Sequence, residues 1–568
     1  MRLAAATTER WSPKPRLRVV EATVDTSASP RHGIIPAMID RFSEVHDTWA
    51  PREMSNRELW HWRAQSTPER TFLWDGGRSF TYCEFDALVQ RFARGLHGLG
   101  VGAGTRVLVG MSTRFETVVA HLAIAQLGGV RVLLVPGMPL EELLFPIAHS
   151  QARIMVADDP IATQVLERRA ECPSIDQLVV LGLGADGPGV VPFDQLGESD
   201  PLAFAPVASD DLHDLSYIVY TSGSTGRPKG VMLKAGSLYH CGLGYADLYG
   251  FHAEDNYFQP LTFGHSLASV AGLGIPMVTG GSVSLVERFR PSKFWTQVAD
   301  CCATISVLFP AHLNLLLEAD DGTTAKGGSS LRFVATHTHL PAFVERFGVD
   351  LGTVWGMTET LGCVGSDPGY RGELGPGYVG RAFTGGEVGI FDEDFNRVGP
   401  YRYGELCYRH PMAMIGYLND PGATATTLRD GWVRSGDRGF VDHSGRAYFA
   451  GRYKAMIKRS GENVSAEEVE AALMEHPDVV ECVVVAVPDR IRTEEVGAIV
   501  VRRAGTDADP VALRDAAAQR LIRWKLPRYI LVRDEPLPRL GNGKIDRTSA
   551  AETIDPAEVW DADKQLTA

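Results

Sequence analysis

Apolar and polar residues recur along the first part of the chain with two periods, one typical of helices and one of buried strands. Residues 84–99 repeat apolar side chains on one helical face, and Gly100 follows as a helix stop. Continuous apolar runs at 106–111 and 130–135 predict buried strands, and residues 115–127 between them predict a helix. Strands that alternate with helices favour βαβ units and a mainly parallel sheet.

The pattern changes towards the C-terminus. Residues 370–450 are rich in Gly and Tyr and hold short apolar runs, which predicts a smaller, mostly antiparallel subdomain. Further on, Ser465-x-x-Glu468 is a capping box that opens a helix, residues 480–487 predict a strand, and residues 510–521 predict another helix. These elements are sufficient for a small α+β domain.

The expected fold is therefore of the α/β class and has three parts. Residues 1–45 are polar and contain prolines, which predicts an N-terminal extension. Residues 46–451 predict a large N-terminal domain of parallel, αβ-layered sheets together with the antiparallel subdomain. Residues 452–568 predict the small C-terminal α+β domain. A chain of 568 residues is too long for one ordinary domain, which agrees with this division.

Composition and charge argue against several classes of function and location. The chain is 44% hydrophobic and 22% charged, which is ordinary for a globular enzyme. Its net charge of −14 argues against non-specific nucleic-acid binding, which needs a basic face. Eight cysteines without a C-x-x-C pair predict reduced thiols and a cytoplasmic location. No run of 18 apolar residues occurs, so we expect neither a transmembrane segment nor, from the polar N-terminus, a secretory signal.

The segment 220–230 is the first candidate site. It follows the apolar run 217–220 and gathers glycines, hydroxyl side chains and cations in one short turn: Thr221, Ser222, Gly223, Ser224, Thr225, Gly226 and Lys229. Backbone N–H groups on such a turn, with hydroxyls and a lysine, can hold a polyphosphate. A Walker A loop fits poorly, because Lys229 is followed by Gly230 rather than Ser or Thr. Taken as composition alone, the segment is better explained as a Gly/Ser-rich surface loop.

Two further segments carry groups suited to a nucleotide. In 352–360, Trp355 offers a flat face for adenine, Thr358 a hydroxyl for phosphate and Glu359 a carboxylate for Mg²⁺. In 431–437, Asp437 follows a strand on a turn and can accept hydrogen bonds from both ribose hydroxyls. The alternatives are a helix entry with an N-cap threonine and an exposed turn aspartate.

Two segments near the C-terminus contain cations and glycines. The first, Gly451-Arg452-Tyr453-Lys454 with the following residues to Asn463, would pass for a solvated basic linker. The second, residues 538–547, places Lys544 on a glycine-bearing loop that would pass for a surface turn.

All five segments occur in the order and at the spacing of the adenylate-forming superfamily, which the chain resembles over residues 55–550. Thr-Ser-Gly-Ser-Thr-Gly-x-Pro-Lys-Gly is similar to its phosphate loop, and Trp-Gly-Met-Thr-Glu to its aromatic-Gly-x-Thr-Glu motif. The segment Trp432 to Asp437, the Gly451-Arg452 linker and the Gly543-Lys544 loop resemble its remaining three motifs. Acyl-CoA synthetases are the branch that the chain resembles most.

The resemblance implies ATP, CoA and Mg²⁺ as cofactors and a small carboxylic acid as substrate. It implies Lys544 as the catalytic cation, Thr221 among the phosphate ligands, Lys454 as the hinge of a mobile C-terminal domain, and Gly461 in the tunnel for the thiol. Residues implied at the nucleotide and CoA are those of the phosphate loop together with Trp355, Gly356, Met357, Thr358, Glu359, Asp437, Arg452, Lys458, Gly461 and Lys544.

The chain departs from the family pattern where the acyl group is expected. The family's Gly-rich segment is replaced by Ala335, Thr336 and His337, which is either a harmless local change or the mark of an altered site. Phe263 and His265 resemble the family's Pro-Leu-Phe-His segment, and His265 either gates the acyl or thiol path or is a core histidine. The small residues at 266–274 either leave room for a bulky apolar acid or mark tight helix packing.

Three functions are therefore considered from the sequence. The first is an acid–CoA ligase. The second is a related enzyme: either an acyl-AMP ligase that loads a separate carrier protein, or a variant with weakened adenylation that mainly forms the thioester from acyl-AMP. The third is a binding protein without turnover, against which the retained Lys544, Glu359 and Asp437 argue. The identity of the acid and the oligomeric state, including a homodimer, stay open.

Overall fold

The computed structural model describes residues 48–182, 187–198, 200, 210–221, 228–319, 327–337, 339–367, 369–370, 374, 377–452, 456–538, 545 and 547–565. The N-terminal extension predicted for 1–45, loop residues 222–227, Lys454 and Lys544 lie outside these ranges.

One sheet of the large domain is built from βαβ units, as the alternating pattern predicts. Among the described residues it has eight strands in the order β19-β9-β8-β4-β3-β5-β6-β7, and the strands from β8 to β7 are parallel. Its strands are β3 (Arg106–Gly110), β4 (Val130–Leu133), β5 (Ile154–Asp158), β6 (Gln177–Leu181), β7 (Val190–Pro192), β8 (Leu215–Thr221), β9 (Lys229–Lys234) and β19 (Gly416–Tyr417).

A second sheet continues from parallel into antiparallel pairing. Its parallel part is β1 (Thr71–Asp75), β10 (Asn256–Gln259), β11 (Ser282–Leu285), β12 (Ile305–Val307), β13 (Phe333–Thr336) and β14 (Asp350–Trp355), with β2 (Arg78–Thr81) antiparallel at the edge. The predicted antiparallel subdomain continues the same hydrogen-bonded sheet through β15 (Val364–Gly365), β16 (Tyr378–Ala382), β22 (Ala447–Arg452), β21 (Trp432–Val441), β18 (Gly404–Arg409) and β17 (Glu387–Phe391), with β20 (Leu428–Arg429) on β21.

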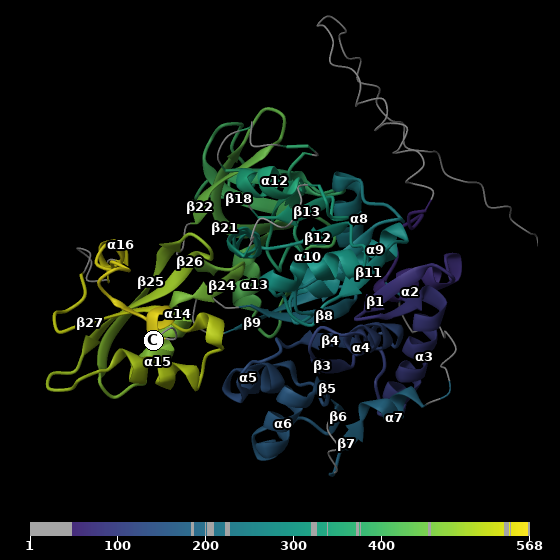
Figure 1. Ribbon diagram of the computed structural model, residues 1–568, viewed down its shortest axis with the longest axis horizontal. Coiled ribbons are helices and arrows are strands. Elements are labelled where there is room, and N and C mark those ends of the chain that lie inside the picture. The colour runs from purple at the N-terminus through teal and green to yellow at the C-terminus, as the bar shows by residue number, and fades with distance from the viewer. Residues whose placement is uncertain are drawn as a thin grey trace, which may run out of the picture. The chain divides into compact units, whose positions relative to one another are not determined.

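Helices connect the parallel strands, and their starts and stops follow local sequence signals. α3 begins after a capping box in which Thr81 and Glu84 satisfy each other's backbone N–H groups, and it buries its apolar face on the neighbouring α4 (Figure 1). The helices of this part are α2 (Asn56–Ser66), α3 (Tyr82–Gly98), α4 (Phe115–Gln126), α5 (Leu140–Ser150), α6 (Asp159–Glu167), α7 (Phe193–Gly197), α8 (Ser237–Tyr249), α9 (Gly272–Thr279), α10 (Pro291–Asp300), α11 (Pro310–Glu318), α12 (Pro341–Phe347) and α13 (Pro421–Thr427). Short turns of other helix types span Arg169–Glu171, Leu267–Ala271 and Arg523–Lys525.

The third sheet and its helices form the C-terminal α+β domain. Its strands are β23 (Met456–Arg459), β24 (Glu462–Ser465), β25 (Val479–Asp489), β26 (Thr493–Arg502), β27 (Tyr529–Arg533) and β28 (Trp560–Asp561). Its helices are α14 (Ala466–Met474), α15 (Pro510–Ala518), α16 (Arg547–Ala551) and α17 (Ala562–Gln565). Apolar side chains of α14, α15, β25 and β26 share one core, which agrees with the predicted α+β class.

One element of the phosphate-loop region differs from a strand–loop–helix unit. The sequence predicts a helix from about Ala235, but β9 first returns antiparallel to β8, and α8 begins at Ser237. The sequence did not predict this short strand, because residues 222–230 are glycine-rich and the strand carries only three apolar residues. The loop therefore joins two paired strands. None of the described helices is long and apolar enough to cross a bilayer.

Candidate active site

Four neighbouring parallel strands end at the same edge of the second sheet. β10, β12, β13 and β14 are adjacent in this order, and each neighbouring pair is parallel. In open α/β sheets, ligands bind at the carboxyl ends of the strands. Phe263 and His265 follow β10, Phe309 follows β12, His337 follows β13 and Glu359 follows β14. The topology thus gathers segments that are far apart in the sequence.

The predicted nucleoside residues Trp355 and Asp437 meet directly. The Trp355 indole Nε1–H donates to Oδ2 of Asp437 at 2.8 Å, and both side chains are buried. Asp437 is the cross-strand partner of Arg452, and its backbone N–H donates to Ser435 Oγ at 2.9 Å. Gly436 precedes it with a φ of +72°, a conformation that glycine adopts without steric cost. Three of the five sequence segments therefore come together here.

The first segment reaches the same place through a tyrosine. The Tyr417 hydroxyl donates to Glu359 Oε1 at 2.7 Å, and Lys229 Nζ lies 4.9 Å from the centroid of the Tyr417 ring. Lys229 is also the cross-strand partner of Thr221 at the base of the phosphate loop. Because Glu359 is buried, its carboxylate has little contact with water, and the Tyr417 hydroxyl replaces one of the lost hydrogen bonds. The sequence contains no motif that would have identified Tyr417.

A cavity of about 1100 Å³ lies beside Lys229, Glu359 and Tyr417 and reaches Gly436, which precedes Asp437. Its volume is sufficient for a nucleotide together with an acyl group, since small-molecule pockets commonly measure about 300–1,000 Å³. The lining includes Thr221, Lys229, Thr358, Glu359, Ser435 and Gly436, and also His265 and Glu462.

The C-terminal domain contributes Glu462 to the cavity lining, directly after a β-turn. β23 and β24 form a hairpin whose two turn residues, Ser460 and Gly461, have φ values of +54° and +86°. Positive φ at both positions is typical of the type I′ turn that suits two-residue hairpins. A Cβ built on Gly461 would lie 2.1 Å from the Phe309 ring, so only glycine permits this contact. Next to it, His265 Nε2 lies 3.3 Å from Glu462 Oε2.

Charges around this turn shift the pKa values of the side chains that meet there. Burial favours neutral His265, but its ion pair and hydrogen bond with Glu462 outweigh this effect and raise the pKa of His265. Burial likewise opposes ionisation of Glu462, yet His265 holds the pKa of that carboxyl below its usual value. The loss of solvent around His337 and His312 lowers the pKa of each to about 4, so both imidazoles are neutral at pH 7. His265 is thus a partner of Glu462 in the C-terminal domain.

Only some of the residues predicted to meet the acyl group lie near Phe309. Ala335 and Thr336 end β13 and are fully buried, and the His337 ring centroid lies 5.4 Å from that of Phe309. Phe263 is buried against the ring of His121, at 5.6 Å between centroids. The structure therefore brings His265 and His337 to Phe309 and places Phe263 in the core.

The small residues after His265 serve tight helix packing. A Cβ on Gly274 would lie 2.3 Å from the backbone oxygen of Leu238, and one on Gly242 would lie 2.3 Å from that of Gly274. α8 and α9 therefore touch through their backbones. This contact favours the packing alternative for at least Gly274.

Several predicted residues cannot be compared with the geometry. The loop residues 222–227, Lys454 and Lys544 lie outside the described ranges, and of Arg452 only the backbone is described. Lys458 lies on β23, with its Nζ 4.6 Å from the Phe449 ring centroid. Within the described ranges, no three His, Cys, Asp or Glu side chains converge as a metal site.

Two family models cover most of the chain. The AMP-binding enzyme model matches residues 60–418, and the model of the AMP-binding enzyme C-terminal domain matches residues 468–544. A probable CoA ligase, CCL9, from Humulus lupulus is 29% identical over 498 residues, 86% of this chain and 94% of the relative. A crotonobetaine/carnitine–CoA ligase from Escherichia coli is 32% identical over 484 residues, 82% of this chain and 92% of the relative.

Solved structures agree with these matches. An o-succinylbenzoate CoA synthetase from Bacillus subtilis superposes with a TM-score of 0.77 at 25% identity, covering 89% of this chain and 99% of that one. The amide bond synthetase McbA from Marinactinospora thermotolerans superposes with a TM-score of 0.76 at 27% identity, covering 87% and 99%. The chain therefore belongs to the AMP-binding enzymes, the adenylate-forming superfamily that contains the acid–CoA ligases.

Proposed function

We propose that the protein is an ATP-dependent acyl-CoA synthetase. It converts a carboxylic acid and ATP into acyl-AMP and pyrophosphate, and then transfers the acyl group to the thiol of CoA with release of AMP. The observation that carries the proposal is the single cavity lined by Thr221, Lys229, Glu359, Gly436 and Glu462. Groups suited to a triphosphate and the turn of the second domain thus open into one space.

The first step needs charge neutralisation more than covalent help. A carboxylate oxygen attacks the α-phosphorus, the bond from that phosphorus to the bridging oxygen breaks, and pyrophosphate leaves with its electron pair. Two anions must approach each other, so catalysis depends on positioning and on nearby cations. Thr221 and Lys229 would hold the phosphates together with loop residues 222–226, and Asp437 would accept from the ribose hydroxyls. Lys544 would contact the reacting oxygens.

Mg²⁺ fits the residues present around Glu359. This ion is commonly held by one or two carboxylates together with phosphate oxygens, and Glu359 is a buried carboxylate fixed by Tyr417 at 2.7 Å. Glu359 would hold the ion, which would offset the negative charge of the triphosphate. Tyr417 keeps the carboxylate turned towards the cavity that Lys229 also lines.

The second step needs a path for a thiol. The sulfur attacks the acyl carbon, the bond from that carbon to the AMP oxygen breaks, and the thiol proton is released to solvent or a nearby base. The Gly461 backbone and the Phe309 ring would form one wall of this path, because their contact leaves no room for a side chain. In the described arrangement, Glu462 after this turn lines the cavity, while Arg547, three residues after Lys544, binds Glu470 within the C-terminal domain.

Lys544→Ala separates the two steps. We expect the variant to lose acyl-AMP formation and largely to keep thioester formation from supplied acyl-AMP, since Lys544 would act only on the first step. Pyrophosphate release without CoA and thioester formation from synthetic acyl-AMP measure the two half-reactions. An equal loss of both would contradict the assigned role.

The acceptor and the acid are determined by a screen. Aliphatic, aromatic and polycyclic acids are tested for ATP-dependent pyrophosphate exchange, and each active acid is then tested with CoA, a carrier protein and a primary amine. The amine is included because McbA, which superposes on this chain, is an amide bond synthetase. We expect CoA to be the productive acceptor. Exchange without CoA turnover would favour one of the other acceptors, and thioester formation from acyl-AMP without exchange would favour weakened adenylation beside His337.

A further inference from the structure

Arg459 determines where the turn at Gly461 points. In the hairpin, Arg459 is the cross-strand partner of Glu462, so these two residues flank the turn residues Ser460 and Gly461. A two-residue turn transmits the direction of its flanking pair with little freedom. Whatever fixes Arg459 therefore fixes the position at which Gly461 meets Phe309.

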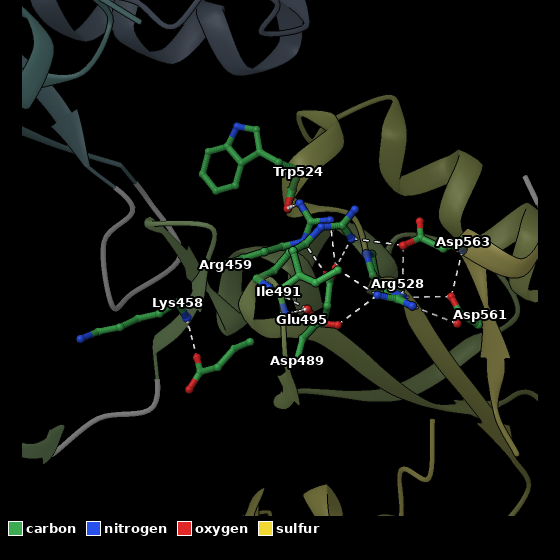
Figure 2. A network of polar contacts seen from close by, with 12 residues as sticks. Lys458, Arg459, Asp489, Ile491, Glu495, Trp524, Arg528, Asp561 and Asp563 are labelled. Carbon is green, nitrogen blue, oxygen red and sulfur yellow. Dashed lines mark hydrogen bonds and ion pairs between the residues drawn. The ribbon is translucent and has the colours of Figure 1, made fainter. Parts of the chain in front are cut away.

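Arg459 is bound by a fully buried carboxylate. Its Nε donates to Glu495 Oε2 at 2.5 Å and its Nη2 to Glu495 Oε1 at 3.2 Å, while Nη1 donates to the backbone oxygen of Trp524 at 3.1 Å (Figure 2). The Glu495 side chain has 0% exposure and that of Arg459 has 14%. A two-pronged arginine–carboxylate pair restricts both distance and orientation, which a single contact does not.

Glu495 also holds two other arginines. Arg492 Nη1 donates a hydrogen bond to Glu495 Oε1. Arg528 Nη1 lies 3.7 Å from the same oxygen (Figure 2). Three guanidinium groups on one carboxylate need further negative charge. Arg528 Nη1 lies 3.1 Å from Asp489, and its Nε lies 3.0 Å from Asp561.

The C-terminal tail supplies part of this compensating charge. Asp561 ends β28, which pairs with β27, and Asp563 in α17 lies 3.2 Å from Arg492 and 3.4 Å from Arg528. Both aspartates come after residue 544, where the match to the AMP-binding C-terminal domain ends. Figure 2 shows the chain of contacts that runs from Asp561 and Asp563 through Arg528 to Glu495 and Arg459.

We propose that Glu495 is a positioning residue for the acceptor half-reaction. Acting through Arg459 it holds the Ser460–Gly461 turn against Phe309, and Asp561 and Asp563 of the tail keep its arginine partners in place. The inference rests on the proposed function, because the turn lies on the thiol path only if a thiol is the acceptor. The adenylation step does not use this turn, so loosening it should affect one half-reaction.

Two substitutions test the anchor. Glu495→Gln keeps the shape of the side chain but removes its charge, and Arg459→Lys keeps a positive charge but loses the two-pronged pair. We expect each to slow thioester formation from acyl-AMP, or to raise the KM for CoA, by about ten- to a hundredfold, since small misplacements at a reacting site have effects of this size. Adenylate formation should stay within about twofold of the unaltered protein, because its groups are not displaced.

The chain offers a matched control in the same domain. Arg502 and Asp534 form a two-pronged pair at 2.7 and 2.9 Å that contacts neither the hairpin nor Glu495 in the described contacts. Asp534→Asn removes a carboxylate of similar geometry and should leave both half-reactions unchanged. A loss equal to that of Glu495→Gln would show that any disturbance of this domain slows the acceptor step, and would overturn the proposal.

Hydrogen-exchange rates distinguish a failure of the proposed anchor at Glu495 from a failure of the proposed function. In Glu495→Gln and Arg459→Lys, we expect faster exchange in residues 457–464 and unchanged exchange in α15, because only the hairpin loses its anchor. Unchanged exchange in the hairpin, or equal losses in both half-reactions, would overturn the inference. The unaltered protein could make no thioester while the variants still show faster hydrogen exchange in residues 457–464. That result would mean that the proposed acceptor is wrong and would support the anchoring of the hairpin by Glu495.

Discussion

Asp437 combines two tasks in one carboxylate. It is buried within β21 rather than on the turn that the sequence predicts, it accepts the indole N–H of Trp355 at 2.8 Å, and the preceding Gly436 lines the cavity. A buried indole N–H without an acceptor costs about 1–3 kcal/mol, so the pair is needed for stability as well as for binding. The same side chain is also the proposed acceptor for the ribose hydroxyls.

Asparagine and alanine at position 437 should separate these tasks. Asp437→Asn keeps an oxygen for Trp355 but loses the negative charge. We expect the KM for ATP to rise about ten- to a hundredfold, as a charged hydrogen bond contributes about 1.5–3 kcal/mol. Asp437→Ala should bind ATP as weakly and also melt at a lower temperature, because it leaves Trp355 without its acceptor. Equal melting temperatures for the two variants would contradict the role of this pair.

Spaced motifs in the sequence predict single residues of the candidate site. Asp437, Trp355 and Glu359 were predicted in this way, and the structure brings the first two into direct contact. Tyr417 contacts Glu359 across 58 positions and belongs to no recognisable pattern. Phe309 follows a three-residue strand and would look like any core aromatic. Contacts of this kind depend on the topology of the sheet, which local patterns do not specify.

The hairpin of β23 and β24 is the element on which the proposed acceptor step would depend. Gly461 has a φ of +86°, and a Cβ there would lie 2.1 Å from the ring of Phe309. Gly461→Ala should therefore slow thioester formation about tenfold or more while acyl-AMP formation changes little, since a misplaced wall affects only the step that uses it. The measurement is again the comparison of the two half-reactions.

Gly505 provides the control for this substitution. It lies in the same domain with a φ of +82°, and nothing lies within 4 Å of a Cβ built there. Gly505→Ala carries the same backbone strain without the contact. If it slows thioester formation as much as Gly461→Ala does, backbone strain alone would explain the effect, and the wall at Phe309 would have no role.

The contact between the hairpin and His265 should depend on pH. Glu462 raises the pKa of His265 and His265 lowers that of Glu462, so the ion pair exists between these two values. Its contribution is complete below the ordinary histidine pKa of about 6.5 and is lost as pH rises through the raised pKa of His265. His337 and His312, with pKa values of about 4, stay neutral throughout this range.

We therefore expect the KM for CoA to rise from neutral to alkaline pH more steeply in the unaltered protein than in His265→Gln. Ionisation of the CoA thiol affects both proteins equally, so the difference between their profiles isolates the ion pair. KM values for CoA measured from pH 6 to pH 9 would show this difference. Parallel profiles would mean that the pair does not hold the hairpin.

Elements were predicted well where their apolar patterns are long. The amphipathic run at 84–99 became α3, and the strand predicted at 480–487 became β25. β9 was missed because a glycine-rich loop precedes it and it spans only six residues, three of them apolar. Short strands of this kind form because a neighbouring strand pairs with them, and such pairing leaves little trace in local sequence.

At the scale of the whole molecule, the described arrangement depends on contacts that no sequence pattern indicates. Lys525 of the C-terminal domain lies 3.2 Å from Glu142 on α5 and 2.6 Å from Glu468 on α14, and its side chain has 10% exposure. The Ile522 backbone N–H also donates to Glu142. Glu142 and Lys525 are 383 positions apart. The family resemblance predicts that the C-terminal domain turns between steps, but it does not show which side chains hold each position.

This cluster leads to a prediction about the balance between the two half-reactions. Burial raises the pKa of Glu142, although Lys525 partly opposes that effect. Glu142→Lys would place two ammonium groups next to each other, and breaking a buried pair in this way costs about 3–5 kcal/mol. The cost applies only to the arrangement in which Glu142 meets Lys525. If that arrangement serves the acceptor step, thioester formation should fall about tenfold or more, while acyl-AMP formation stays within about twofold.

Glu141→Lys is the matched control, because it makes the same charge change one residue earlier on α5. Among the described contacts, Glu141 pairs with Arg168 and with no residue of the C-terminal domain. We expect this variant to keep both half-reactions. Equal loss in Glu141→Lys and Glu142→Lys would assign the effect to the charge of α5, and equal loss of both half-reactions in Glu142→Lys would mean that the contact serves neither step selectively. Selective loss in Glu142→Lys alone would identify Lys525 and Glu142 as the contact that holds the C-terminal domain in place while the thiol reacts.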